Sequence, residues 1–173
     1  MIDVNRLARD ARDGDREALG RFLSAIQGDI WRFCAHLTRT DDADDLAQES
    51  LLRVVSHLHR WQGDSAMAWS LGVARNVCFD HLRRKGRRRT DPVSDVPAVG
   101  VIDAYGVVET MQLLADLPPE QREAIVLTQL IGLPYADAAD VMGVPVGTIR
   151  SRVARGRDSL AAELSEHQRR RPG

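Results

Sequence analysis

Two clusters of basic side chains are the groups in this sequence best suited to chemistry, and that chemistry is phosphate binding. The chain carries 24 Lys and Arg against 25 Asp and Glu, so its net charge of −1 conceals these local clusters. From residue 147 to 173, seven arginines face three acids. Basic islands of this kind neutralise phosphates, although an arginine run is more often a solvated face or a tail. The other island comprises Arg83, Arg84, Lys85, Arg87, Arg88 and Arg89, against the single acid Asp80.

No group of residues predicts catalysis, a metal site or a bound cofactor. The five histidines have no metal-ligand spacing with carboxylates or cysteines. Cys34 and Cys78 are isolated, without a CxxC pair, and Cys34 is predicted to lie on an apolar helix face. The glycines form no GxxxxGK[ST] phosphate loop. The sequence therefore predicts a protein of recognition rather than an enzyme.

Length and composition predict one ordinary domain or two small ones. The 173 residues are 43% hydrophobic and only 5% aromatic, so the cores consist mainly of aliphatic side chains. The first residues contain no apolar signal region, and no run approaches the ~20 apolar residues that span a bilayer. We expect a cytoplasmic protein of a reducing compartment, with no membrane contact of its own.

The elements that must position the basic islands are predicted to be helices. Apolar residues recur at helical spacing on both sides of residues 90–108, and no strand-like alternation is bounded by hairpin turns. Residues 90–108 hold two prolines and two glycines without an apolar stripe, which predicts a flexible linker. The sequence therefore predicts an all-α protein of two small helical domains. In the first half, a separate helix is expected at each of the apolar stripes 4–11, 18–26, 30–37, 51–58 and 69–82.

The segment from Pro134 to Leu160 predicts a helix-turn-helix. This motif needs a small residue where its helices cross, a residue that tolerates an unusual φ in the turn, and an apolar contact back to the first helix. Ala139, Gly143 and Ile149 fit these three places. The alternative without a DNA-binding function is a helical hairpin with a solvated basic face. No acid occurs between Gly147 and Arg157, however, and this favours DNA binding.

With these motifs in hand, nearly the whole chain resembles the extracytoplasmic-function (group IV) sigma factors of bacterial RNA polymerase. DDADDLAQESLLRV resembles sigma region 2.2, and WQGDSAMAWSLGVARNVCFDHLRRKGRRR resembles regions 2.3 and 2.4. LPPEQREAIVLTQLIGLPYADAADVMGVPVGTIRSRVARGRDSL resembles region 4. The resemblance implies sigma region 2 at 1–89, a linker at 90–108, region 4 at 109–168 and a basic tail at 169–173.

The resemblance also implies a function for each region. Region 2 binds core RNA polymerase and the minus-ten element, and region 4 binds the minus-thirty-five element. An anti-sigma factor is a further expected partner. The alternative is a helix-turn-helix repressor that does not engage polymerase. The implied polymerase-binding residues are Asp45, Gln48 and Glu49, the minus-ten residues are Asn76, Arg75, Arg83, Arg84, Lys85, Arg87 and Arg88, and the minus-thirty-five residues are Thr148, Arg150, Ser151, Arg152 and Arg155.

Local spacing agrees with parts of this assignment. Asp45, Gln48 and Glu49 share one helical turn, expected opposite a buried stripe that includes Val55. Without the resemblance, this turn reads as a solvated face. Two interpretations of Arg75 stay open, a phosphate contact and a structural ion pair. Asp80 and His81 are expected to form a local surface pair.

One segment departs from the family pattern. Family members commonly read WLYRIARN where this chain reads WSLGVARN, so Leu71 and Gly72 replace an aromatic and a basic residue. A glycine inside a helix costs ~1 kcal/mol relative to alanine. The missing aromatic is expected to remove a possible stacking surface.

Overall fold

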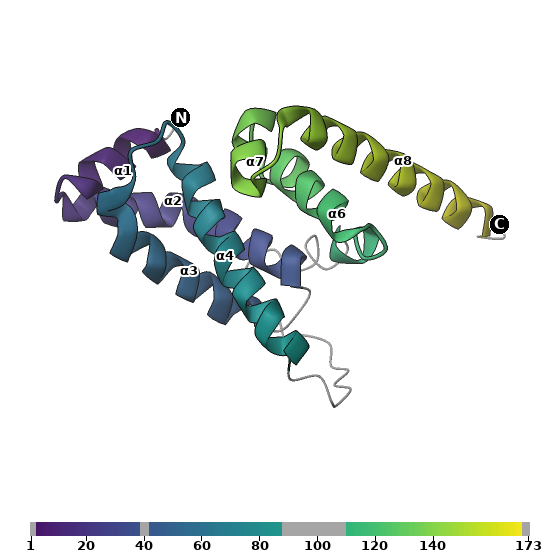
Figure 1. Ribbon diagram of the computed structural model, residues 1–173, viewed down its shortest axis with the longest axis horizontal. Helices are drawn as coiled ribbons and strands as arrows, with labels where there is room; N and C mark the ends of the chain where they lie inside the picture. The colour runs from purple at the N-terminus through teal and green to yellow at the C-terminus, as the bar shows by residue number, and fades with distance from the viewer. Residues whose placement is uncertain (1–2, 39–41, 88–109, 171–173) are drawn as a thin grey trace. The chain divides into compact units, whose positions relative to one another are not determined.

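The computed structural model describes residues 3–38, 42–87 and 110–170, and these fold into helices without any strand (Figure 1). The all-α prediction is therefore confirmed. The chain divides into two compact units, Met1–Ile102 and Asp103–Gly173. The predicted linker lies outside the described residues, and the limits of the four regions stay a prediction. Among the described helices, none is both long and apolar enough to cross a membrane.

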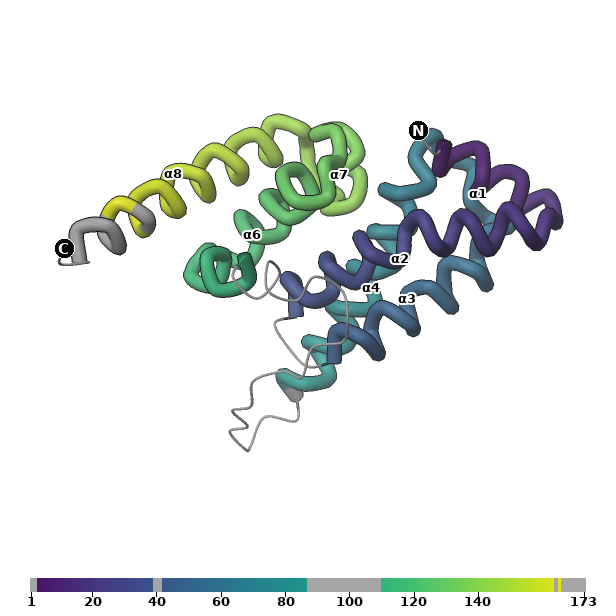
Figure 2. Tube along the Cα trace, turned by 180° about the vertical axis from the view of Figure 1, so that it is seen from behind, coloured from purple at the N-terminus to yellow at the C-terminus, as the bar shows by residue number. Residues whose placement is uncertain are grey.

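The first unit is a bundle of four helices. α1 spans Val4–Arg12, α2 Arg16–Thr38, α3 Ala43–His57 and α4 Ala66–Arg87, with a 3₁₀ turn at Leu58–Arg60 between α3 and α4. α2 packs against each of the other three helices, and α3 packs along α4 (Figure 2). The core side chains are aliphatic and aromatic, as the composition predicts. The largest fully buried side chains of this unit are Phe22, Ile26, Ile30, Phe33, Cys34, Val54, Leu71, Val77 and Cys78.

α2 differs from the prediction, because the stripes at 18–26 and 30–37 lie on one continuous helix. Gly28 falls between them without ending the helix, and its φ is not positive. Ile26, Ile30 and Phe33 are all fully buried on one face. Burial of this face outweighs the ~1 kcal/mol that an internal glycine costs. Half-buried Asp29 follows Gly28; burial raises its pKa, and Arg32 at 2.7 Å opposes that shift.

The start of α4 is fixed by side chains that cap its free amides. The Ser65 hydroxyl accepts a hydrogen bond from the Ala68 amide at 3.2 Å, and Asn5 from α1 accepts one from the Ala66 amide at 2.8 Å. Capping of this kind stabilises a helix end by about 1 kcal/mol. α1 therefore anchors the helix that carries Arg83, Arg84 and Lys85 of the basic island.

The second unit contains α6 at Pro119–Ile125, a π-helical turn at Val126–Leu130, α7 at Tyr135–Met142 and α8 at Val146–Arg170. α6 and α7 both pack on α8. Buried Arg122 donates hydrogen bonds at 3.0 Å to the carbonyls of Leu114, Ala115 and Leu117. These carbonyls follow the helical residues 110–113 and are satisfied by charge-assisted bonds. Arg122 therefore holds the chain that enters α6 and does not belong to the basic surface.

The helix-turn-helix prediction is confirmed by the geometry of α7 and α8. Gly143 ends α7 with φ 65°, a left-handed conformation that favours glycine. The Val144 amide then donates to the Ala139 carbonyl at 3.1 Å and closes the turn. Ala139 and Ile149 are buried at the helix contact. α8 is long enough to continue past this motif to Arg170.

Candidate functional site

The outer face of α3 carries the three residues predicted to bind polymerase. Asp45 and Gln48 are exposed, and Glu49 is half-buried. Leu46, Ala47, Ser50 and Val54, on the other side of the helix, are buried in the bundle. The bundle core holds α3 from behind and leaves the polar turn open, so the structure brings these three residues together on one accessible surface.

Two apolar residues of α3 lie on that surface, and one of them corrects the prediction. Val55 is 38% exposed, although it was expected in the buried stripe. At about 100° per residue it falls on the same side as Gln48. Leu52 is 69% exposed and lies one turn after Gln48. Sequence reasoning missed Leu52, although its i+4 spacing from Gln48 was a usable signal. The surface is therefore partly apolar, unlike a purely solvated face.

A chain of charges links α3 to α4. Arg53 donates to Glu49 at 2.5 Å, and its guanidinium lies 3.8 Å from the carboxylate of Asp80 on α4. Asp80 also accepts a hydrogen bond from Arg83, one turn further along α4. Asp80 therefore pairs with two arginines and not with His81, contrary to the prediction. The predicted polymerase-binding Glu49 and the predicted DNA-binding Arg83 are joined through two intervening residues.

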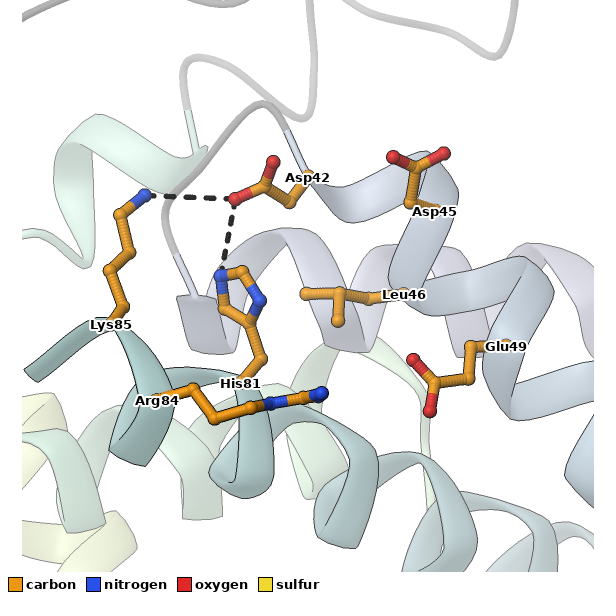
Figure 3. Close-up of a pocket in the computed structure, with 7 residues that line it drawn as sticks. All are labelled: Asp42, Asp45, Leu46, Glu49, His81, Arg84 and Lys85. Carbon is orange, nitrogen blue, oxygen red and sulfur yellow. Dashed lines mark ion pairs between the residues drawn. The ribbon is translucent and has the colours of Figure 1, made fainter. Parts of the chain in front are cut away.

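A pocket between the start of α3 and the end of α4 brings acidic and basic side chains together (Figure 3). Asp42 lies 3.1 Å from His81 Nε2 and 3.6 Å from Lys85 Nζ. The His81 contact has ion-pair distance without hydrogen-bond alignment. The guanidinium of Arg84 extends along the pocket toward Glu49 (Figure 3). Its Nε donates to the Asp80 carbonyl at 3.2 Å.

The predicted minus-ten residues that the structure describes lie along α4. Asn76 is exposed, and Arg83, Arg84 and Lys85 are exposed further along the helix. Arg87 is the last residue of α4, whereas Arg88 lies outside the described residues. Arg75 stacks on the ring of Phe79, with its guanidinium carbon 4.4 Å from the ring centroid. This cation–π contact is a third alternative to the two considered for Arg75.

Position 71 corrects the expectation about a missing stacking surface. Leu71 is fully buried in the bundle, so its side chain belongs to the core and not to the side predicted to face DNA. Gly72 lies next to it toward the outside, and a Cβ atom there would meet nothing within 4 Å. The departure at 71 therefore leaves the outer surface of α4 unaffected. The departure at 72 removes a side chain from that surface.

α8 presents the predicted minus-thirty-five residues opposite its packed stripe and on the flanks of that stripe. Arg150, Ser151 and Arg155 are exposed, and Thr148 and Arg152 are half-buried. The Ser151 hydroxyl donates to the Thr148 carbonyl at 3.0 Å and retains its acceptor lone pairs. Ile149, Val153 and Gly156 are buried on the opposite side. The structure therefore places Thr148, Ser151 and Arg155 on the side away from this packed stripe, with Arg150 and Arg152 on its two flanks.

The packed side of α8 approaches α6 closely at Gly156. A Cβ atom at this position would lie 2.5 Å from Ile125 Cδ1, so only glycine permits the observed spacing. Next to it, Arg157 donates a hydrogen bond to the Gln129 side chain at the π-helical turn. Arg157 thus contributes to holding the unit together, whereas Arg155 points the other way.

The chain matches two family models and several curated proteins. The model described as Sigma-70 region 2 matches residues 22–88, and that described as Sigma-70, region 4 matches residues 108–160. ECF RNA polymerase sigma factor SigC of Mycobacterium tuberculosis is 46% identical over 170 residues, which cover 92% of this chain and 90% of that protein. ECF sigma factor SigM of the same organism is 35% identical over 157 residues, which cover 87% and 79%.

The fold has a solved counterpart in the sigma factor RpoE of Bartonella quintana, crystallised in complex with the anti-sigma factor NepR. The two chains are 29% identical with a TM-score of 0.71, and the match covers 84% of this chain and 96% of RpoE. Helix order, helix-turn-helix geometry and sequence similarity define a transcription factor of the sigma-70 class. Within that class, the chain belongs to the ECF RNA polymerase sigma factors.

Proposed function

We propose that this sigma factor binds core RNA polymerase through the outer face of α3, captures the opened minus-ten element with α4, and reads the duplex minus-thirty-five element with α8. The observation that carries the proposal is Leu52, which is 69% exposed on the face of Asp45, Gln48 and Glu49, one turn after Gln48. An exposed leucine framed by acids and an amide suits a partner helix with apolar and basic side chains. A repressor that ignores polymerase has no use for such a face.

The α4 surface supports capture of single-stranded DNA. An amide such as Asn76 pairs with the edge of a base only when the base is unstacked. The neighbouring cations Arg83, Arg84 and Lys85 attract the strand's phosphates. Binding energy gained only with the opened strand offsets part of the unstacking cost, which is a few kcal/mol per base. Differential binding of this kind favours the opened promoter.

The α8 surface supports reading of duplex DNA. A recognition helix enters the major groove with its first residues against base edges. Thr148 and Ser151 are small enough for close approach, and Arg155 has the fork of donors that suits guanine. Arg150 and Arg152 flank this strip and suit phosphate contacts. Such a division gives both sequence preference and positioning.

The proposed function also assigns the chemistry and the partners. The chain supplies recognition, and the polymerase supplies nucleotide addition, so the chain itself catalyses nothing. Its place of action is the cytoplasm, where polymerase and promoter meet. Because RpoE of Bartonella quintana is crystallised with an anti-sigma factor and resembles this chain in fold and sequence, we include a dedicated anti-sigma factor among the partners. Co-expression with that regulator is expected to lower transcription from the sigma factor's promoters.

Reversal of the acidic charge on α3 tests the polymerase contact. Glu49→Lys is expected to weaken core polymerase binding by at least about tenfold, because like charges across an interface cost several kcal/mol. Asp45→Ala is expected to weaken it less. Affinity is measured by titrating labelled protein with core polymerase, and run-off transcription on genomic fragments then maps the promoters.

The matched control is Glu17→Lys, which makes the same charge change at an exposed position of α2. It is expected to bind core polymerase like the unaltered chain. If the unaltered chain fails to bind core polymerase but still binds DNA, the repressor alternative replaces the proposal. If Glu17→Lys and Glu49→Lys lose the same amount of polymerase affinity, the loss is due to net charge and not to a contact at α3.

A further inference from the structure

Asp42 occupies the N-cap position of α3 but does not cap that helix. Its side chain makes no capping hydrogen bond to the first turn, all of which the structure describes. An aspartate at this position usually accepts such a bond and stabilises the helix end. The Asp42 carboxylate instead reaches α4, where its Oδ2 atom lies 3.1 Å from His81 Nε2 and 3.6 Å from Lys85 Nζ. The function proposed above gives this contact no role.

A single carboxylate oxygen therefore lies opposite two nitrogen atoms of α4. A lysine is ordinarily charged throughout the neutral range, whereas a histidine gains its charge between about pH 8 and pH 5. While His81 is neutral, Lys85 supplies the positive charge that faces Asp42. Once His81 is protonated, a second positive charge lies closer to the same oxygen, and the attraction between opposite charges grows as their distance falls. Protonation therefore favours exchange of the Asp42 partner from Lys85 to His81.

The three side chains differ in their freedom to respond to this exchange. The His81 side chain is 21% exposed and its Nε2 atom is buried, so the ring stays in the pocket (Figure 3). The Lys85 side chain is 53% exposed, and its flexible stem lets the ammonium group turn toward solvent. Lys85 is thus the partner that is free to leave Asp42. The other charged or titratable groups around His81 are Asp45, Glu49 and Arg84 in the pocket, and buried His36 in the last turn of α2, which also packs on α4.

We propose that protonation of His81 releases Lys85 from Asp42, so that α4 binds the opened promoter strand more strongly as the pH falls. The inference rests on the proposed function, because it concerns the strand that α4 holds. The released ammonium group of Lys85 joins the exposed cations Arg83 and Arg84 at the same end of the helix and adds one phosphate contact. Because coupling between two binding events is reciprocal, the bound strand in turn favours protonation of His81.

The pH dependence of holoenzyme binding to promoter DNA tests the inference. The probe is a promoter mapped by run-off transcription, with a duplex upstream element and a single-stranded minus-ten element. Variants are compared with the unaltered chain at the same pH, so that titration of the polymerase itself cancels. At about pH 6 and about 0.1 M salt, His81→Gln is expected to bind ~5-fold more weakly than the unaltered chain, with a salt dependence that is shallower by ~0.7, the values for one phosphate contact. At about pH 8 the two are expected to bind alike.

Three further variants separate release of Lys85 from other effects of charge. Asp42→Asn keeps a favourable N-cap residue but frees Lys85 at every pH, so binding at about pH 8 is expected to rise to the level of the unaltered chain at about pH 6. Lys85→Gln removes the cation that is released and is expected to show the weak pH dependence of His81→Gln. His59→Gln is the matched control at an exposed position of the 3₁₀ turn, and it is expected to keep the full pH dependence. A purely structural role of His81 does not make the effect depend on Lys85.

Several results overturn the inference and leave the proposed function intact. One is the same pH dependence for His81→Gln and the unaltered chain, and another is an equal change for His59→Gln and His81→Gln. A pH dependence that persists in full in Lys85→Gln or Asp42→Asn also overturns it, because His81 then contacts a phosphate directly. If the unaltered holoenzyme binds no promoter DNA at either pH and starts no transcript, the proposed function itself fails, and the inference fails with it.

Discussion

α4 and α8 both carry arginines on an exposed face, but the charges of the two helices are arranged in opposite ways. On α4, Arg83 pairs with Asp80 and Lys85 pairs with Asp42. On α8, Arg150 and Arg155 make no ion pair with any part of the chain that the structure describes. The glycines are reversed too, because Gly156 faces packed α6 and Gly72 faces open space.

Under the proposed function, the two surfaces are therefore expected to bind DNA by different exchanges of ionic partners. α8 offers its arginines to phosphates and bases without giving up a partner. On α4, the cations must exchange the carboxylates of Asp80 and Asp42 for DNA phosphates, so the net electrostatic free energy gained on binding is smaller. Exposed ion pairs are worth only about 0–1 kcal/mol each, which makes this exchange easy once polymerase holds the strand nearby. α8 is therefore suited to finding a duplex, and α4 to holding a strand that has already been opened.

The largest expected effect in this comparison comes from Arg155. Arg155→Ala is expected to weaken binding of the matched minus-thirty-five duplex by about 1–3 kcal/mol, because a bidentate base contact is lost. Arg157→Ala is the control on the same helix, since Arg157 donates to Gln129 within the unit. It is expected to have a smaller effect that is the same for every sequence. Fluorescence anisotropy of holoenzyme with matched and scrambled duplexes measures both.

An equal loss on matched and scrambled DNA assigns Arg155 to a phosphate instead. A loss that is larger for Arg157→Ala than for Arg155→Ala contradicts the orientation of α8 toward DNA. Either result contradicts the difference proposed between α8 and α4, because the exposed arginines of α8 then only neutralise phosphate charge.

A smaller effect of opposite sign is expected from Asp80. Asp80→Asn frees Arg83 and Arg53 from their carboxylate and is expected to strengthen binding of the chain to single-stranded DNA by about 0.2–1 kcal/mol. The gain is expected to shrink at high salt, because exposed charges are screened. The measurement is a titration of labelled oligonucleotide at two salt concentrations.

Glu17→Gln serves as the control for net charge, since it removes one exposed acid from α2. It is expected to change the affinity less than Asp80→Asn does. Equal gains from the two variants show that net charge alone matters. In that case the ion pair between Asp80 and Arg83 does not affect how α4 binds DNA.

The sequence predicted the second unit well because its signals are local. Gly143 marks the turn, and the apolar residues that follow recur at helical spacing up to Gly156, so fold and exposed face both follow from one short segment. The sequence also predicted the polar turn of α3, because the spacing of Asp45, Gln48 and Glu49 places them together.

The first unit was harder to predict because its decisive contacts join distant residues. Arg53 and Asp80 meet only when α3 packs on α4, and no local pattern pairs them. The break expected between the two stripes of α2 is absent because tertiary burial outweighs the local cost of Gly28.

The contrast between the two glycines can be tested through the stability of each unit instead of through DNA binding. Gly72→Ala is expected to raise the free energy of unfolding by up to about 1 kcal/mol, since alanine favours helix and the new methyl group meets no atom within 4 Å. Gly156→Ala brings the same intrinsic gain but places Cβ 2.5 Å from Ile125 Cδ1, so overpacking is expected to cancel or exceed it. Hydrogen exchange of α4 and α8 measures each change in its own unit. Equal stabilisation at both positions contradicts the close approach of α8 to α6. Gly72→Ala can also be tested in holoenzyme, with promoter DNA whose minus-ten element is single-stranded. If the variant stabilises α4 yet weakens binding of this DNA, the open space at Gly72 serves DNA binding rather than the fold.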